Sequence, residues 1–123
     1  MVAQSTQPGQ THMAPKRNPL KLNNLQLRTL ALAQVLASEP GITERDETTG
    51  EVTLLRMPEP HGDHVHIGAI VVSGREASGL RNPAVWVALE RKGLARSEGS
   101  SAVTLTARGV AYETGLGDRF GAS

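Results

Sequence analysis

Three histidines and one aspartate stand close together in the run HGDHVH, residues 61–66. Imidazole nitrogens and carboxylate oxygens are ligands of divalent ions such as zinc. On an extended strand His64 and His66 point to the same face, and His61 lies in the loop just before them. The run therefore offers ligands for zinc or nickel. A fourth strong ligand at a fixed spacing is missing, and the alternative is a polar loop whose histidines meet solvent. The sequence alone therefore assigns no metal and no cofactor.

Cationic side chains are the second set that bears chemistry. Five of them lie in residues 75–96, where only Glu76 and Glu90 oppose them, whereas residues 39–51 hold five acids against Arg45. A chain divided in this way can present one face to a polyanion and another face that repels it. The alternative is an ordinary solvated surface with uneven charge, and the formal net charge of +1 decides nothing by itself.

Catalytic groups do not form any pattern that indicates an enzyme. The chain has no cysteine, which excludes disulfides, thiolate metal sites and thiol catalysis. Ser73 is not part of a G-x-S-x-G motif, and no G-x-x-x-x-G-K-[ST] loop is present. With one Trp, one Tyr and one Phe, the chain also lacks the aromatic residues that stack single-stranded bases. We therefore expect a protein that is not an enzyme.

The first predicted element is a helix that begins after Asn23 or Asn24 and runs to about Ser38. Either asparagine is a good N-cap, and Pro40-Gly41 ends the helix. Its leucines fall on two adjoining stripes, which make a wide apolar face. We expect this helix at the centre of the core or at a dimer seam.

The middle of the chain is predicted to form β-strands. The runs 42–45 and 51–57 flank a polar turn that contains glycine, which is typical of a hairpin. Residues 64–73 predict a further strand that pairs with the preceding one, because the β-branched residues 70–72 disfavour helix. The competing interpretation makes residues 67–77 a helix.

Loops are expected on both sides of the strand 64–73. Pro58 and Pro60 bracket a loop that runs through Asp63, since neither ring can donate a hydrogen bond to a sheet. Residues 74–79 are expected to form a turn or a single helical turn.

The next predicted helix spans residues 83–92. Asn82 caps it, Pro83 takes the first helical position, and Gly93 ends it. The inward stripe is Val85, Trp86 and Leu89. The outward positions are Ala84, Val87, Ala88 and Arg91. Trp86 is expected to anchor the core.

A hairpin and a short helix follow. Residues 95–97 and 102–105 are predicted to pair around Glu98-Gly99-Ser100-Ser101, and Thr106 caps the last helix. The order of elements is helix, β-meander, helix, hairpin and helix, which predicts an α+β fold.

Residues 83–113 read PAVWVALERKGLARSEGSSAVTLTARGVAYE. In this run Lys92-Gly93-Leu94 closes a helix, a hairpin follows, and Leu105-Thr106-Ala107-Arg108-Gly109 opens the next helix. The run resembles the back half of a winged helix-turn-helix domain, particularly of the MarR-like group, in which the β-hairpin is the wing. The resemblance implies a winged-helix-like domain over residues 20–115. An inserted β-hairpin or meander takes the place of the second helix of that family.

The same resemblance implies a small non-catalytic DNA-binding protein, a transcriptional regulator whose helix 83–92 docks in a groove of duplex DNA. Arg81 and Asn82 would meet phosphate at the start of the helix, and Arg91 would lie near base edges. A homodimer is expected, because related proteins bind two half-sites. The expected DNA-binding residues are Arg75, Arg81, Asn82, Arg91, Lys92, Arg96 and Arg108.

A protein-interaction module on the same scaffold is the alternative. Its apolar face would consist of Ala84, Val87 and Ala88, since Arg91 alone among the outward positions can hydrogen-bond a base. The predicted wing tip, residues 98–101, also lacks the Arg or Lys that enters a minor groove.

The two ends of the chain are expected to be flexible. Residues 1–19 hold almost no branched aliphatic side chains, so we expect a disordered basic arm, and residues 116–123 predict a flexible tail. No apolar run approaches twenty residues, and the N-terminus lacks the apolar core of a signal peptide. We therefore expect a soluble, cytoplasmic protein with no membrane partner.

Overall fold

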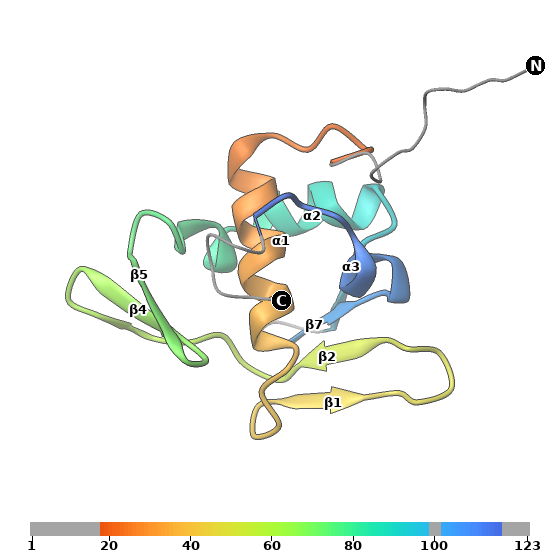
Figure 1. Ribbon diagram of the computed structural model, residues 1–123, viewed down its shortest axis with the longest axis horizontal. Coiled ribbons are helices and arrows are strands. Elements are labelled where there is room, and N and C mark those ends of the chain that lie inside the picture. Colours follow the sequence, from red (N-terminus) through yellow and green to blue (C-terminus); the bar gives the residue numbers. More distant parts are fainter. Residues whose placement is uncertain (1–17, 99–101, 117–123) are drawn as a thin grey trace, which may run out of the picture.

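The computed structural model describes residues 18–98 and 102–116, and Figure 1 shows their arrangement. Residues outside the described part are most of the predicted arm 1–19, residues 99–101 of the predicted wing tip 98–101, and most of the predicted tail. The elements are α1 (Asn24–Leu36), β1 (Thr43–Arg45), β2 (Val52–Leu54), β3 (Pro60–His61), β4 (His64–Ile67), β5 (Ile70–Ser73), the 3-10 helix η1 (Ser78–Arg81), α2 (Pro83–Arg91), β6 (Ala95–Glu98), β7 (Ala102–Leu105) and α3 (Ala107–Ala111). Helices and antiparallel sheets occur together, so the predicted α+β class is confirmed.

Helix α1 lies at the centre of the molecule, between the hairpins and the other helices (Figure 1). Asn23 and Gln26 form a capping box, in which each side chain accepts a hydrogen bond from the backbone N–H of the other. Among the most deeply buried side chains are Leu30, Leu32 and Leu36. Most of the wide apolar face of α1 is therefore buried within the chain, as expected for a helix at the centre of the core.

One sheet joins both predicted hairpins in the order β1-β2-β7-β6. The hairpin of β1 with β2 and the hairpin of β6 with β7 are both confirmed. Strand β2 also pairs with β7, which the sequence did not predict; Val52 faces Leu105 and Leu54 faces Val103 in this register. These side chains are buried against the core. The sheet therefore links the β-meander directly to the hairpin that follows α2.

The segment 64–73 forms strand structure, as predicted, and the competing helix over 67–77 is wrong. The segment is a hairpin, however, because Gly68 and Ala69 turn the chain between β4 and β5. Gly68 has a φ of 58°, which suits the first position of a two-residue turn. Strand β4 pairs with β3 and β5 rather than with β2, so the predicted pairing with the preceding strand 51–57 is also wrong.

Strand β3 corrects another expectation, because it lies inside the predicted loop between Pro58 and Asp63. The two residues of β3 pair with β4, Pro60 opposite Val65 and His61 opposite His64. Proline is tolerated here because β3 is an edge strand and needs no donor on its outer side. The hairpin of β4 and β5 lies to one side of α1 in Figure 1, away from β1 and β2.

Helix α2 follows the single turn η1, and its predicted boundaries are confirmed to within one residue. Asn82 accepts a hydrogen bond from the Ala84 backbone N–H, and Pro83 takes the first helical position. Trp86 is 6% exposed, and its Nε1 donates to the Leu80 carbonyl at 2.8 Å. The prediction that this tryptophan anchors the core is confirmed.

Helix α3 closes the domain against α1 and the end of α2. Thr106 caps α3 by accepting from the Gly109 N–H, and its hydroxyl donates to the Gly93 carbonyl at 2.7 Å. The Gln34 amide on α1 donates to the carbonyls of Gly109 and Tyr112.

No helix within residues 18–98 and 102–116 has both the length and the apolar character needed to cross a membrane.

Candidate functional site

Helix α2 turns its predicted outward positions toward solvent. Ala84 and Arg91 are exposed, Ala88 is half-buried, and Val87 is 45% exposed. The buried stripe of this helix is Val85, Trp86 and Leu89. The apolar periodicity was sufficient to place each of these residues, because a helix can bury only one side against the core.

A hollow of about 750 Å³ borders this face of α2. It lies between α2, the segment 56–59 and the hairpin of β6 and β7. Its lining is mainly apolar and includes Met57, Pro58, Leu80, Trp86, Val87 and Val103. Sequence reasoning missed the hollow, because its walls come from three separate parts of the chain.

Two of the predicted DNA-binding arginines are held by carboxylates. Arg81 forms an ion pair with Glu59 at 2.8 Å. Arg96 donates two hydrogen bonds to Glu51, at 2.6 and 3.0 Å, in the bidentate geometry that favours such pairs. The hydrogen bonds from Arg96 hold the pKa of the Glu51 carboxyl below its ordinary value. Each pair partly cancels a positive charge that the DNA-binding prediction requires.

Three other predicted cations lie around the end of α2. Arg91 and Lys92 are exposed at the last turn, and the exposed Arg108 reaches toward the same turn from α3. Its Nη1 lies 3.2 Å from the position that a Cβ on Gly93 would take. The Lys92 ammonium donates to the Leu20 carbonyl at 3.4 Å. We call Arg91, Lys92 and Arg108 the basic group of α2; their charges also suit the negative end of the helix dipole.

The remaining two predicted residues lie elsewhere. Asn82 uses its side-chain oxygen to cap α2, so this oxygen is engaged by the helix itself. Arg75 is exposed in the turn between β5 and η1. The structure therefore brings three of the seven residues together at the C-terminal end of α2 and places the other four away from that end.

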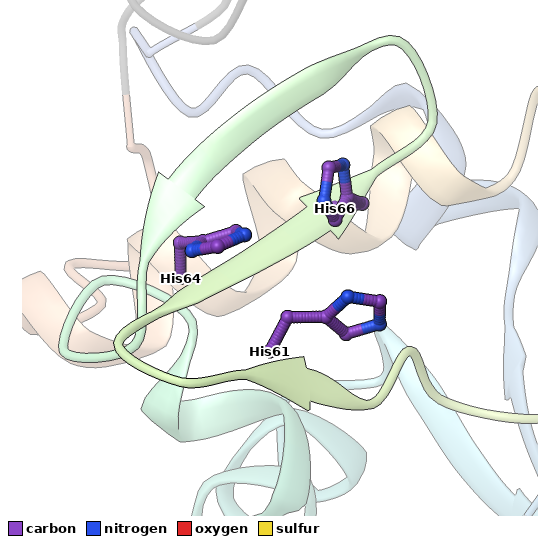
Figure 2. Close-up of side chains that lie close together, drawn as sticks. All are labelled: His61, His64 and His66. Carbon is purple, nitrogen blue, oxygen red and sulfur yellow. The ribbon is translucent and has the colours of Figure 1, made fainter.

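The histidines of the run HGDHVH form a compact cluster, which Figure 2 shows on one side of the hairpin of β3 and β4. The potential ligand nitrogens of His61, His64 and His66 all lie within 4.8 Å of one another. The ring centroid of His66 lies 5.2 Å from the ring centroid of His61 and also 5.2 Å from that of His64. His61 and His66 are exposed and His64 is half-buried.

The backbone explains why these rings converge. Along β4 His64 and His66 alternate with Val65 and Ile67, which are buried. Gly62, with a φ of 69°, and Asp63 form a two-residue turn that places His61 directly opposite His64. The sequence placed His64 and His66 on one face, but it left His61 in a loop because β3 was not predicted.

One carboxylate lies close to the cluster. The Asp63 carboxylate lies 3.6 Å from His64 Nδ1, and its side chain is fully exposed. His66 also borders a hollow of about 330 Å³, whose lining includes Glu39 and Arg56. Imidazole rings in this arrangement can bind a metal ion.

Comparison of the chain with protein-family models, curated proteins and solved structures gives no match. Function is therefore inferred from the residues and from their geometry in this fold.

Proposed function

We propose that the protein is a small, non-catalytic DNA-binding protein that acts in transcription regulation and contacts duplex DNA through α2. Support comes from the order of elements around α2: a helical turn precedes it, the hairpin of β6 and β7 follows, and α3 begins at the residues that resemble the MarR-like pattern. In this proposal the domain is winged-helix-like, α2 is the recognition helix, and the hairpin is the wing.

The observation that carries the proposal is the basic group of α2. Its three side chains are exposed around one turn, at the end of a helix whose outer side faces solvent. Lys and Arg in this setting neutralise phosphates and release counterions from the duplex. Among the outward residues of α2 only Arg91 is able to read a base edge. We therefore propose binding that depends mainly on the phosphate backbone.

The paired arginines have a weaker role in this proposal. Arg81 and Arg96 bring carboxylates with them, Glu59 and Glu51, and a carboxylate beside a phosphate is repelled. Either arginine must exchange its partner for a phosphate before it contributes to binding. The basic group requires no such exchange of an ion-pair partner, because none of its described contacts is to a carboxylate.

A homodimer is part of the same proposal, because two copies of α2 on a symmetric site double the number of phosphate contacts. Helix α1 offers little apolar surface for the interface, since Leu30, Leu32 and Leu36 are buried in the chain and Leu25 and Leu27 are partly buried. Sedimentation equilibrium, with and without duplex DNA, measures this oligomeric state.

Fluorescence anisotropy with a labelled duplex of mixed sequence tests the DNA proposal. Three phosphate contacts predict a slope of about −2.7 for log K against log salt when one chain binds, or about 40-fold weaker binding for a roughly fourfold rise in salt, and about twice this slope when a homodimer binds. Each of Arg91→Ala, Lys92→Ala and Arg108→Ala should lower the steepness of this slope by about 0.9 for each bound chain. Arg45→Ala is the matched control, because Arg45 is exposed on β1 in the acidic part of the chain.

Two results contradict the proposal. One is the absence of measurable binding at low salt, where counterion release favours contact most. The other is an equal loss of DNA affinity in Arg45→Ala and in the variants of the basic group. This result would mean that overall charge, and not α2, determines DNA binding.

The hollow beside α2 favours a second candidate, a module that binds a protein segment. Val87 is 45% exposed beside Trp86, so an apolar side chain of the partner would bury it. Peptides selected from a random displayed library should shift the emission of Trp86, and Val87→Asp should abolish their binding. Val71→Asp is the control, because Val71 is also exposed but lies on β5. If the peptides bind Val87→Asp with the same affinity as the wild-type protein, this hollow is excluded as their binding site.

A further inference from the structure

We propose that His61, His64 and His66 form a binding site for one divalent transition-metal ion, with zinc as the expected occupant. Their potential ligand nitrogens all lie within 4.8 Å of one another. Figure 2 shows the three rings gathered on the same side of the hairpin, with none directed away from the other two. The site is independent of the proposed DNA contact, since it lies on β3 and β4 and not on α2.

The required adjustment is small. Tetrahedral zinc with zinc–nitrogen distances of about 2.1 Å places neighbouring ligand nitrogens about 3.4 Å apart. Side-chain rotation is sufficient to bring the nitrogens to this separation, because His61 and His66 are exposed and their rings are free to turn. The backbone needs no change: His61 and His64 are direct partners in the β3–β4 pairing, and His66 shares the face of His64.

The ligand chemistry selects the class of ion. Three imidazoles suit zinc, nickel, copper and iron, whereas calcium and magnesium require oxygen ligands. Three protein ligands also leave a position open on tetrahedral zinc, as in sites that bind a further small ligand or water. The site therefore differs from a closed structural zinc centre.

Asp63 supplies a partner for one ligand. Its carboxylate lies 3.6 Å from His64 Nδ1 and its side chain is fully exposed, so a small rotation brings it within hydrogen-bond distance. A carboxylate that accepts from one ring nitrogen orients the imidazole and leaves the other nitrogen for the metal. This arrangement assigns Nε2 of His64 as the ligand atom and Asp63 as a positioning residue.

Isothermal titration of the metal-free full chain with zinc chloride tests the site. The expected result is one ion per chain, with binding that weakens at least about tenfold in each of His61→Ala, His64→Ala and His66→Ala. His12→Ala is the matched control, because His12 is the fourth histidine of the chain and lies outside the described residues. Far-UV circular dichroism without metal should be unchanged in all four variants, since the three clustered histidines contribute no buried apolar side chain.

A spectroscopic measurement adds the geometry. Cobalt chloride in place of zinc should give the visible absorption of a tetrahedral centre, with intensity lost in His64→Ala and reduced in Asp63→Asn. Calcium chloride should give no saturable binding.

Several outcomes overturn the proposal. Zinc affinity that is unchanged in the three cluster variants excludes these ligands, and so does an equal loss in His12→Ala. One ion per two chains excludes a site made by the histidines of a single chain. Saturable calcium binding of similar affinity excludes a nitrogen-ligand site. DNA binding is not measured in these experiments, so their failure leaves the α2 proposal standing.

Discussion

Substitution of Gly79 by alanine should loosen the contact between η1 and α1. A Cβ on Gly79 would lie 1.8 Å from the Thr29 Oγ1 and 3.2 Å from Leu25 Cδ1. The φ of Gly79 lies outside the left-handed region, so the backbone itself accepts alanine. Any loss of stability therefore measures the clash with α1 and not backbone strain.

The magnitude follows from the surroundings of Thr29. This side chain is completely buried on α1, so it cannot turn into solvent to make room. Overpacking of a core lowers the free energy of unfolding by about 1–3 kcal/mol, and we expect about 3 kcal/mol for an overlap as severe as this one. Loss of glycine entropy in the unfolded chain offsets about 0.4–1 kcal/mol of this. The expected net loss is about 2–2.5 kcal/mol, or about 8–20 °C in the unfolding midpoint of a domain this small.

A second substitution isolates the contact. Thr29→Ala removes the clashing hydroxyl, which is buried and has no hydrogen-bond partner within the described part of the chain. The nearest remaining neighbours then lie at 3.2 Å, a distance that needs adjustments of only a few tenths of an ångström. In the Thr29→Ala background Gly79→Ala should therefore cost only about 0.5 kcal/mol, which leaves a coupling of about 2 kcal/mol.

Urea unfolding followed by tryptophan fluorescence measures these values, since Trp86 is the sole tryptophan and is buried. Gly41→Ala is the matched control, because no atom lies within 4 Å of a Cβ built there. The reasoning is refuted if Gly79→Ala is no more destabilising than Gly41→Ala, or if its cost is the same with and without Thr29. Because η1 leads directly into α2, the same variant should also weaken DNA retention.

Two further predictions concern α3 and the paired carboxylate. Gly109→Ala should lower the free energy of unfolding by more than about 3 kcal/mol, because the added Cβ would lie 2.0 Å from the backbone oxygen of Leu94. An unchanged midpoint of thermal unfolding would contradict this contact. Arg96→Met should raise the pKa of Glu51 toward the ordinary value of about 4.3, as measured by carboxyl ¹³C chemical shifts in an NMR titration. Since folding lowers the pKa of Glu51, the ion pair contributes stability that is present above about pH 4.3 and is lost as the pH falls through the lower folded pKa. A Glu51 pKa that is the same in wild type and in Arg96→Met would contradict the assignment.

Local signals were sufficient to locate the helices. Each helix begins at a cap where the sequence predicts one: α1 at Asn23 with Gln26, α2 at Asn82 with Pro83, and α3 at Thr106. These predictions succeed because a cap acts on backbone donors only two or three residues away. The inward side of α2 was predictable for a related reason, since the helical repeat alone decides which side chains share a face.

Strand pairing was less predictable. The apolar run 64–73 indicated extended structure, but its division by Gly68 and Ala69 into two strands changes every partner in the segment. The pairing of β2 with β7 also joins residues such as Thr53 and Thr104, which are 51 positions apart. No local pattern specifies such a pair, because many β-branched runs have similar edges and the packing of the whole core selects among them.

The amino-acid sequence by itself determined the composition of the core, the helix boundaries and the set of chemically capable side chains. Only the tertiary structure decided which of those side chains act together. It pairs Arg81 and Arg96 with carboxylates that are 22 and 45 residues distant, gathers the basic group of α2, and brings His61 opposite His64. The physical reason is that charge and coordination act over a few ångströms in space, and a folded chain brings residues within that range whatever their separation in sequence.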